Sequence, residues 1–198
     1  AGLAVATSVL AMALSAVDVR YQVKRQEKKR QQDLEDRARI LALYDEQTMM
    51  RNRASFQQEI VAWIQRCEQT QQSFDLFHCA LKVGGAAHDE HVEHAMRDIA
   101  ERIRPHLRDT DILARFSQAE FIVMRMRVHA ADLPYRLHEQ LHVICSQPIQ
   151  YSDTLLLPMP QLGSAQYPND GRHSRSLLQV AQSKAAVLAI PVPLRRVA

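Results

Sequence analysis

Two apolar runs separated by a short polar segment constrain the fold of this chain more than any other feature. Residues 112–116 and 121–128 are rich in apolar side chains, and Ser117-Gln118-Ala119-Glu120 lies between them. Apolar runs of this length joined by a polar turn are typical of a β-hairpin. The turn contains no Gly, Asn or Asp, although tight hairpin turns usually need a residue that tolerates positive φ. The sequence therefore predicts a hairpin with unusual turn chemistry.

Three motifs follow one another across this hairpin: Arg108-x-x-Asp111, Ala114-Arg115-Phe116 and Ser117-Gln118-Ala119-Glu120-Phe121. Together they resemble the signature region of the GGDEF family, the diguanylate cyclases that make cyclic di-GMP. In that family an Arg-x-x-Asp motif precedes a strand of the form hydrophobic-Ala-Arg-hydrophobic, and Gly-Gly-Asp/Glu-Glu-Phe follows. Only the last two residues of that signature match here, so the chain resembles a degenerate member.

Two further blocks extend the resemblance over about residues 44–189. The family opens its domain with Asp-x-Leu-Thr-Gly-Leu-Pro-Asn-Arg and an aromatic residue three positions on. Near its end it carries Ser-Ile-Gly-Ile-Ala-x-Tyr-Pro-x-Asp-Gly. This chain keeps Asp45, Thr48, Asn52, Arg53 and Phe56 of the first block, and residues 161–171 match the second closely.

The resemblance implies an α/β (α+β) domain, in which helices flank a central, mainly antiparallel sheet of about five strands. Apolar periodicity predicts helices and strands in a compatible order. The predicted helices cover residues 54–72, 92–107, 129–146 and 174–189, and the predicted strands cover residues 74–83, the two hairpin arms, residues 155–157 and the region around Leu162.

The positions that hold the catalytic magnesium in the family have lost their acids. The family uses one acid on the first strand and one at the third signature position. Here Ala80 and Lys82 stand at the acidic positions of the strand, and Ala119 stands in the signature. Glu120 survives, but one carboxylate cannot gather a magnesium ion. We therefore predict no diguanylate cyclase activity, no catalytic residues, no metal site and no cofactor.

The loop that reads guanine in the family is also shorter here. It contains no Asn, and Glu93 lies roughly where the guanine-reading Asp would be. A degenerate site that still binds GTP is therefore a weaker hypothesis. His88, His91 and His94 share a helix face, but their spacing fits no zinc motif, which favours solvated histidines over a metal site.

The Arg108-x-x-Asp111 motif survives, and in relatives it forms an inhibitory product site. One hypothesis is that the domain senses cyclic di-GMP through Arg108 and Asp111. The pair could equally be a helix cap or a surface ion pair. The alternative function is a module that binds no ligand. Such a module would relay signals to, or control, an adjacent or partner EAL phosphodiesterase or another effector.

The N-terminal segment has the character of a membrane helix. Residues 1–17 carry no charge, which is near the lower limit for a spanning helix. The basic residues at 24–30 place the following segment in the cytoplasm. We expect a transmembrane helix over residues 1–19, either alone or as the last of several, in the bacterial inner membrane. A cleaved signal peptide and a buried Ala-rich helix remain alternatives.

The remaining segments connect the domain to its surroundings. Residues 20–43 form a predicted cytoplasmic connector helix, and residues 190–198 a linker or tail. Sparse apolar positions in the connector leave open a dimeric coiled coil and a solvated helix, and we expect a homodimer. The net charge of +3 gives no reason to expect nucleic-acid binding. Three cysteines form no disulfide framework.

Overall fold

The computed structural model describes residues 2–84, 88–127 and 134–187, without the side chains of residues 2–19. The chain divides into two units, Ala1–Ala42 and Leu43–Ala198. Helix α1 (Gly2–Leu43) is a continuous helix whose side chains from Arg20 onward are exposed. Residues 20–43 contain no Gly or Pro, which suits a continuous helix, and their role as a cytoplasmic connector stays a prediction.

Among the described residues, no helix combines the length and apolar character that crossing a membrane requires. The side chains of residues 1–19 lie outside the described part of the chain. The transmembrane helix predicted there therefore stays a prediction.

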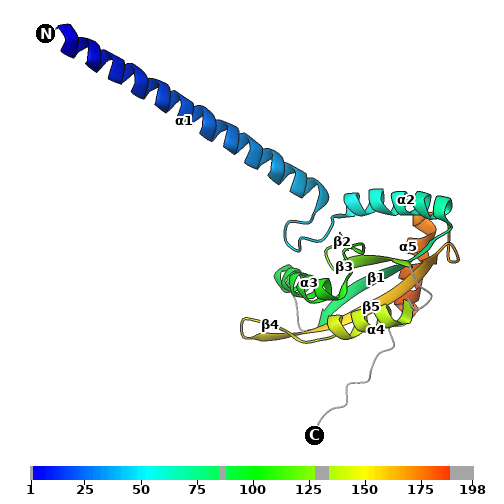
Figure 1. The fold of residues 1–198 in the computed structure, drawn as a ribbon. Helices are drawn as coiled ribbons and strands as arrows, with labels where there is room; N and C mark the ends of the chain where they lie inside the picture. The colour runs from blue at the N-terminus through cyan, green and yellow to red at the C-terminus, as the bar shows by residue number, and fades with distance from the viewer. Residues whose placement is uncertain (1, 85–87, 128–133, 188–198) are drawn as a thin grey trace. The chain divides into compact units, whose positions relative to one another are not determined.

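The second unit is built on one five-stranded sheet with the strand order β2-β3-β1-β5-β4 (Figure 1). Every neighbouring pair of strands is antiparallel. This confirms the fold expected from the sequence. The strands are β1 (Ser73–Gly84), β2 (Ile112–Ser117), β3 (Glu120–Arg127), β4 (Ile149–Tyr151) and β5 (Thr154–Tyr167).

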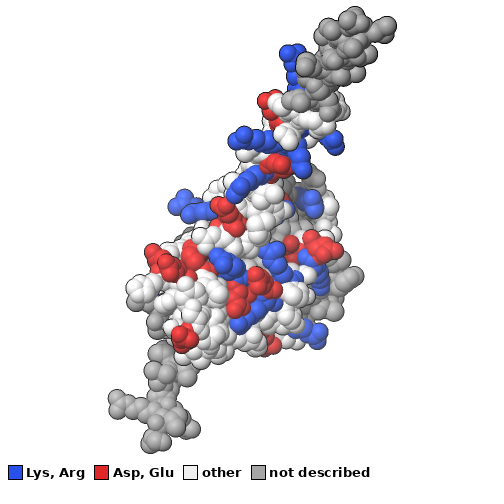
Figure 2. All heavy atoms as spheres, turned by 90° about the vertical axis from the view of Figure 1, so that its left-hand side faces the viewer, with Lys and Arg blue, Asp and Glu red and all other residues white. Residues whose placement is uncertain are grey.

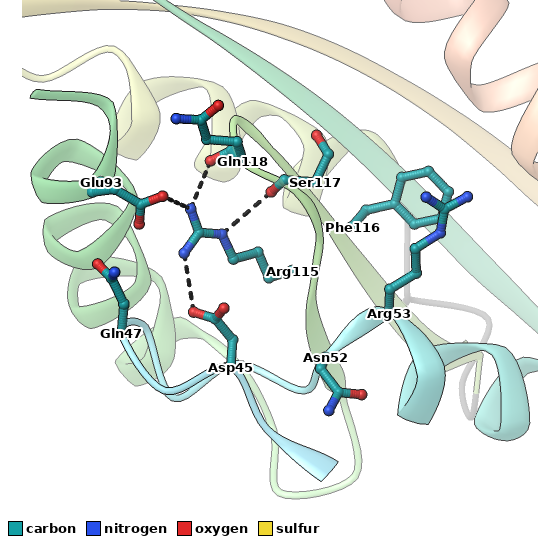
Figure 3. A pocket seen from close by; sticks show the side chains of 9 residues that line it. All are labelled: Asp45, Gln47, Asn52, Arg53, Glu93, Arg115, Phe116, Ser117 and Gln118. Atoms are coloured by element: carbon teal, nitrogen blue, oxygen red, sulfur yellow. Dashed lines mark hydrogen bonds and ion pairs between the residues drawn. The ribbon is translucent and has the colours of Figure 1, made fainter. Parts of the chain in front are cut away.

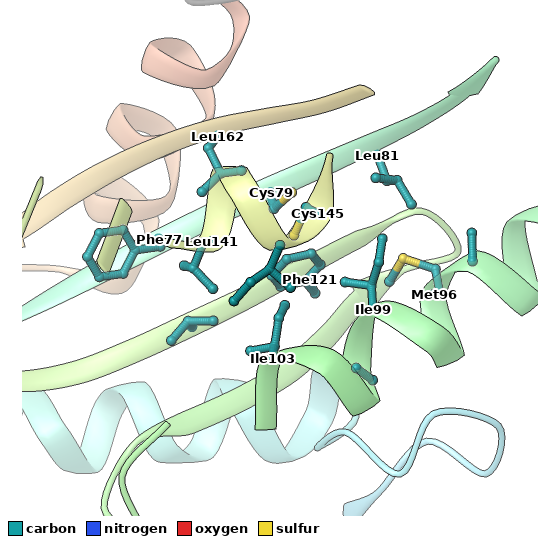
Figure 4. Close-up of a cluster of buried hydrophobic side chains, with 14 of the residues drawn as sticks. Phe77, Cys79, Leu81, Met96, Ile99, Ile103, Phe121, Leu141, Cys145 and Leu162 are labelled. Atoms are coloured by element: carbon teal, nitrogen blue, oxygen red, sulfur yellow. The ribbon is translucent and has the colours of Figure 1, made fainter. Parts of the chain in front are cut away.

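Helices cover both faces of the sheet. Helices α2 (Arg53–Thr70) and α5 (Ser174–Val187) pack on one face, and α3 (Asp89–Ile103) and α4 (Pro134–Cys145) pack on the other (Figure 1). Strand β1 contributes to both cores because successive side chains of a strand point to opposite faces. Phe74 and Leu76 face α2 and α5, whereas Phe77 and Cys79 face α3 and α4 (Figure 4).

Local signals in the sequence explain where the helices begin and end. Asn52 caps α2 by accepting a hydrogen bond from the backbone N–H of Ser55 at 2.8 Å. Helix α3 begins at Asp89 and ends at Ile103, earlier than predicted, and a 3₁₀ turn, η1 (Arg104–His106), follows it. Pro105 lies in that turn and has no N–H to continue the α-helix.

Two other elements differ from the prediction. Strand β5 is continuous over the region where two separate strands were expected. Helix α4 begins at Pro134, and the predicted start of this helix at residue 129 lies outside the described residues.

Gly163 explains why α5 can lie so close to the sheet. A Cβ atom at this position would lie 2.0 Å from the carbonyl oxygen of Ala181 and 2.3 Å from the nitrogen of Ala185. Only glycine leaves room for the helix backbone there. The match of residues 161–171 to the family block therefore has a packing reason.

Candidate functional site

The turn between β2 and β3 closes with two residues, Gln118 and Ala119, because Ser117 pairs with Glu120. Neither turn residue has a positive φ. The register of the hairpin shifts between Arg115 and Ser117, which marks a β-bulge. This irregularity lets the hairpin close without the glycine or asparagine that its sequence lacks.

Strand β1 lies beside this turn, as the sequence predicted. Ala80 pairs with Glu120 across the β1–β3 ladder, and the backbone N–H of Leu81 donates to the carbonyl of Ala119 at 2.8 Å. Two residues before Ala80, on the same face of β1, lies the side chain of His78. The strand position nearest the turn therefore carries a methyl group where a metal site would need a carboxylate.

His78 and Glu120 are the titratable pair at this end of β1. His78 Nε2 lies 3.8 Å from Glu120 Oε1, which is too long for a hydrogen bond. Both ring nitrogens of His78 are buried and have no hydrogen-bond partner. Burial lowers the pKa of His78, and the charge of Glu120 offsets part of that effect. The ring is therefore held neutral at pH 7.

These donors do not fit a magnesium ion. Magnesium prefers oxygen ligands in an octahedral arrangement, and here Glu120 supplies a carboxylate while Ala80 and Ala119 supply none. Within residues 2–84, 88–127 and 134–187, no group of three or more His, Cys, Asp or Glu side chains is placed to hold a metal.

A cavity of about 380 Å³ opens beside the hairpin (Figure 3). Its walls come from the loop before α2, from α3 and from the hairpin. The lining residues are Asp45, Gln47, Asn52, Arg53, Glu93, Arg115, Phe116, Ser117 and Gln118.

Arg115 reaches across this cavity and joins its walls. Its side chain is only 8% exposed. Nη1 donates to Asp45 Oδ1 at 3.1 Å, and Nη2 donates to Glu93 Oε1 at 2.6 Å. Nη2 also donates to the carbonyl of Gln118 at 2.8 Å, and Nε donates to that of Ser117 at 3.2 Å. The guanidinium therefore binds both carboxylates and the hairpin turn.

The charges of this cluster stabilise one another. Burial by itself would lower the pKa of Arg115, but hydrogen bonds to Glu93 and Asp45 and their negative charges raise it above its ordinary value. Burial would likewise raise the pKa of Asp45. Hydrogen bonds from Thr48 and Arg115, with the charge of Arg115, lower the pKa of Asp45 instead.

The loop that carries Asp45 is fixed to the hairpin through its backbone as well. The N–H of Arg51 donates to the carbonyl of Leu113 at 3.0 Å, and the N–H of Arg115 donates to the carbonyl of Arg51 at 2.7 Å. Sequence reasoning matched Asp45 and Arg115 to separate motifs and gave neither a role. Their pairing joins residues 70 positions apart, which no local pattern indicates.

Arg108 and Asp111 lie on the turn that enters β2. Asp111 Oδ2 accepts a hydrogen bond from the backbone N–H of Arg108 at 2.9 Å. The same oxygen accepts from Arg125 Nε at 2.8 Å, and the Asp111 side chain is fully buried. Arg125 also donates to the carbonyl of His106 at 3.1 Å. The sequence did not single out Arg125, which pairs with Asp111 from the neighbouring strand.

Three arginines surround a second cavity at this turn. It has a volume of about 300 Å³, and Arg51, Arg104 and Arg108 line it together with Asp109 and Asp111. Arg104 Nη2 donates to the carbonyl of Thr48 at 2.8 Å, which fixes its guanidinium. The cavity thus places several cationic groups near the Arg108-x-x-Asp111 motif.

Two of the three histidines of the α3 region, His91 and His94, pack against Tyr151, and His88 packs against His91. The rings of His91 and His94 have centroids 5.1 and 4.8 Å from that of Tyr151, and the His88 ring lies 5.6 Å from His91. His94 Nε2 lies 3.3 Å from the carbonyl oxygen of Gln150. The arrangement is an aromatic contact between α3 and β4.

Comparison with known families identifies the scaffold. The family described as "Diguanylate cyclase, GGDEF domain" matches residues 42–187. The chain belongs to the GGDEF family. The match includes both the hairpin and the loop that carries Asp45.

One curated relative matches most of this chain. The cyclic di-GMP phosphodiesterase NbdA of Pseudomonas aeruginosa is 29% identical over 207 residues, which cover 90% of this chain and 26% of NbdA. The chain thus spans about a quarter of the length of NbdA.

Among solved structures, a sensory box/GGDEF family protein from Caulobacter crescentus CB15 has a TM-score of 0.63 and 22% identity, covering 73% of this chain and 96% of that one. The coiled coil and GGDEF domain of DgcB from Caulobacter crescentus, solved in complex with c-di-GMP, has a TM-score of 0.63 and 17% identity. That alignment covers 86% of this chain and 93% of DgcB. Both likenesses concern the fold.

Proposed function

We propose that this chain is a regulatory GGDEF domain of a cyclic di-GMP signalling protein and does not itself synthesise cyclic di-GMP. The pairing of Ala80 with Glu120 carries this proposal, because it puts a methyl group beside the turn. Joining two GTP molecules requires metal ions that neutralise charge on the phosphates. Ala119 removes the second carboxylate that the family resemblance implies.

The cavity beside the hairpin supports the same proposal. Glu93 lies roughly where the family resemblance implies a guanine-reading acid, and it accepts a 2.6 Å hydrogen bond from Arg115. Its other carboxylate oxygen is buried. A carboxylate bound in this way is not presented to a guanine base. GTP is therefore expected to bind weakly at this cavity.

The regulatory ligand we propose is cyclic di-GMP, bound at the cavity beside Arg108 and Asp111. Arg51, Arg104 and Arg108 line that cavity, and guanidinium groups bind phosphate through paired N–H donors. Arg125 pairs with Asp111, which removes one negative charge that would oppose an anion in this cavity.

Isothermal titration calorimetry with cyclic di-GMP tests this ligand on the purified full chain. We expect a saturable heat for the wild-type protein and at least a roughly tenfold weaker affinity for Arg108→Ala, since a charge-assisted pair contributes over about 1.4 kcal/mol. Arg136→Ala is the matched control, because Arg136 is an exposed arginine on α4 that lies outside this cavity. A wild-type protein that gives no heat would reject the sensor.

The second candidate is a relay module that binds no nucleotide and acts on an EAL phosphodiesterase domain, adjacent or in a partner protein. The complete burial of the Asp111 side chain against Arg125 favours this alternative. So does the name of NbdA, a phosphodiesterase of which the chain spans about a quarter. Under this alternative, cyclic di-GMP gives no heat, while deletion of the domain from the full-length protein changes its phosphodiesterase rate.

We also propose that residues 1–19 anchor the chain in the bacterial inner membrane, with residues 44–189 on the cytoplasmic side. The uncharged residues 1–17 followed by the basic residues 24–30 support this orientation. Alkaline extraction of membranes from expressing cells tests the anchor. Recovery of the chain in the supernatant would contradict it.

A homodimer through the connector helix, residues 20–43, completes the proposal. Exposed apolar side chains on α1 provide its contact surface, and the solved DgcB structure contains a coiled coil with its GGDEF domain. These side chains are Tyr21, Val23, Leu34, Ile40, Leu41 and Leu43. Multi-angle light scattering should give a dimer mass for the wild type and a lower mass for Leu34→Asp.

A further inference from the structure

Positive charge is concentrated at the start of the described side chains of helix α1. Residues 20–30 contain six basic residues and one acid, whereas residues 31–43 contain two basic residues and three acids. All of these side chains are exposed. Figure 2 shows Lys and Arg side chains projecting from the described part of α1. The net positive charge is therefore confined to about three turns of the helix.

Most of this charge lies on one side of the helix. Successive residues of an α-helix are turned by about 100° around its axis, so side chains four apart lie nearly in line. Two such lines, residues 20, 24 and 28 in one and residues 25 and 29 in the other, occupy about half of the circumference together with Tyr21. Tyr21 is 63% exposed. We call this half the basic face, and its residues are Arg20, Tyr21, Lys24, Arg25, Lys28 and Lys29.

The basic face keeps its charge within the part of the chain that the structure describes. No described side chain forms an ion pair with its five basic residues. Glu27, the one acid of residues 20–30, lies on the other half of the helix. Like charges four residues apart on a helix repel one another. An anionic partner would relieve this repulsion, and the exposure of the face leaves it open to one.

The opposite side of α1 carries apolar side chains that suit the proposed homodimer. Val23, Leu34 and Leu41 lie within about 20° of one another around the helix axis, and about 150° from the middle of the basic face. All three side chains are exposed. A homodimer formed through this line leaves the basic face of each copy pointing outward. The partner of the basic face is therefore not the second copy.

The position of the basic face along the chain indicates which anion it meets. Residues 1–17 carry no charge, and the basic face begins three residues later. An α-helix rises 1.5 Å per residue, so residues 20–30 extend over about 15 Å. If residues 1–19 cross the bilayer, this length matches a headgroup layer of about 5–8 Å and one Debye length of about 8 Å. The acids Asp33, Glu35 and Asp36 begin where the field of the lipid phosphates has decayed.

We propose that the basic face binds the phosphate groups of anionic phospholipids at the membrane surface. This inference rests on the proposed membrane anchor, which brings residues 20–30 to the headgroup layer. Basic side chains next to a membrane segment are attracted to anionic headgroups, and tyrosine is enriched at the same depth. Nucleic acid also carries phosphate groups, but it gives no reason for the charge to be confined to the turns that follow the uncharged residues.

Lysine acetylation tests this proposal on the full chain. The purified chain is mixed with phosphatidylcholine alone, or with lipid of which about a third is phosphatidylglycerol, and vesicles form as detergent is removed. Sulfo-N-hydroxysuccinimide acetate then labels the accessible lysines, and peptide mass spectrometry measures each rate. Lys82, an exposed lysine of β1, is the internal reference. Phosphatidylglycerol should lower the rates at Lys24, Lys28 and Lys29 relative to Lys82 at least about threefold. About 1 M salt should abolish this protection.

Two double variants remove the same charge inside and outside the basic face. Arg20→Gln/Arg25→Gln removes two charges of the face and should at least about halve the protection of the three lysines. Arg37→Gln/Arg39→Gln removes two charges farther along α1 and should leave the protection as in the wild type. An equal loss in both variants would overturn the proposal, because the protection would then follow net charge alone. Protection by duplex DNA but not by phosphatidylglycerol would also overturn it.

Flotation of the same vesicles separates this proposal from the membrane anchor. A chain that floats with both kinds of vesicle and shows equal relative lysine rates in them supports the anchor and overturns the lipid contact. A chain that floats only with phosphatidylglycerol, and leaves those vesicles in about 1 M salt, supports the lipid contact and contradicts the anchor. A chain that floats with neither kind overturns both.

Discussion

Removing the guanidinium of Arg115 should destabilise the GGDEF domain more than any surface substitution. In Arg115→Ala, the carboxylates of Asp45 and Glu93 lose their shared partner, and the carbonyls of Ser117 and Gln118 lose a donor. The backbone hydrogen bonds of Arg51 with Leu113 and Arg115, and the packing of Met50 in the core, still join the loop before α2 to the hairpin.

The expected cost follows from the burial of the groups. Breaking a buried ion pair by removing one partner costs about 3–5 kcal/mol. The two carboxylates are 25% and 23% exposed, so water solvates them in part once Arg115 is gone. We therefore expect Arg115→Ala to lower the free energy of unfolding by about 2–4 kcal/mol. Lys184→Ala removes the exposed Lys184–Asp170 pair and should cost less than about 1 kcal/mol.

Urea unfolding monitored by tryptophan fluorescence measures this cost. Trp63, the one tryptophan of the chain, is 6% exposed and lies edge-on to Phe74, so its emission reports the unfolding of this domain. A loss below about 1 kcal/mol for Arg115→Ala would refute the structural role of the cluster.

The pH dependence of the free energy of unfolding is a second test of the Arg115 cluster. The pKa of Asp45 is lower in the folded protein than its ordinary value of about 4, so the unfolded chain binds more protons there as the solution is acidified. Its contribution to stability is complete above pH ~4 and is lost as the pH falls through the folded pKa. The difference in the free energy of unfolding between wild type and Arg115→Ala should therefore become smaller below pH ~4. A difference that stays constant down to pH 3 would contradict the ion-pair explanation.

Three other substitutions test other parts of the structure with the same unfolding assay. Gly163→Ala places a Cβ against the α5 backbone and should lower the free energy of unfolding by at least about 2 kcal/mol. A loss below about 0.5 kcal/mol would contradict the close packing. Arg125→Met leaves the buried Asp111 carboxylate unpaired and should cost about 3 kcal/mol, whereas a surface pair would cost under about 1. Burial lowers the folded pKa of His78, so the free energy of unfolding of the wild type should fall as the pH drops below about 6.5. His78→Leu should make this pH dependence weaker. An equal pH dependence in both proteins would assign the effect to other titratable groups.

The hairpin and the main helices could be predicted because their signals are local. The apolar residues 112–116 and 121–128 are short-range patterns that tertiary contacts reinforce. The continuity of β5 could not be predicted in this way. Pro158 and Pro160 interrupt its sequence and are typical of a strand end, yet β5 stays paired with β1 through both positions.

The residues of the candidate sites could likewise be predicted only in part. Motif matching found Asp45, Asp111 and Arg115 but not which residues pair with one another, because the decisive contacts join distant parts of the chain. Arg115 reaches Asp45 over 70 residues and Glu93 over 22, and Arg125 reaches Asp111 over 14. Which carboxylate an arginine neutralises depends on strand register and loop position. A single sequence contains no direct signal for either.

We propose that this GGDEF scaffold lacks the carboxylates that gather metal ions at its hairpin. The amount of cyclic di-GMP that the purified wild-type chain forms from GTP and magnesium, measured by liquid chromatography, tests this most directly. We expect none above a reaction without protein. Cyclic di-GMP that forms in proportion to the chain, and that disappears in Glu120→Gln, would contradict the claim.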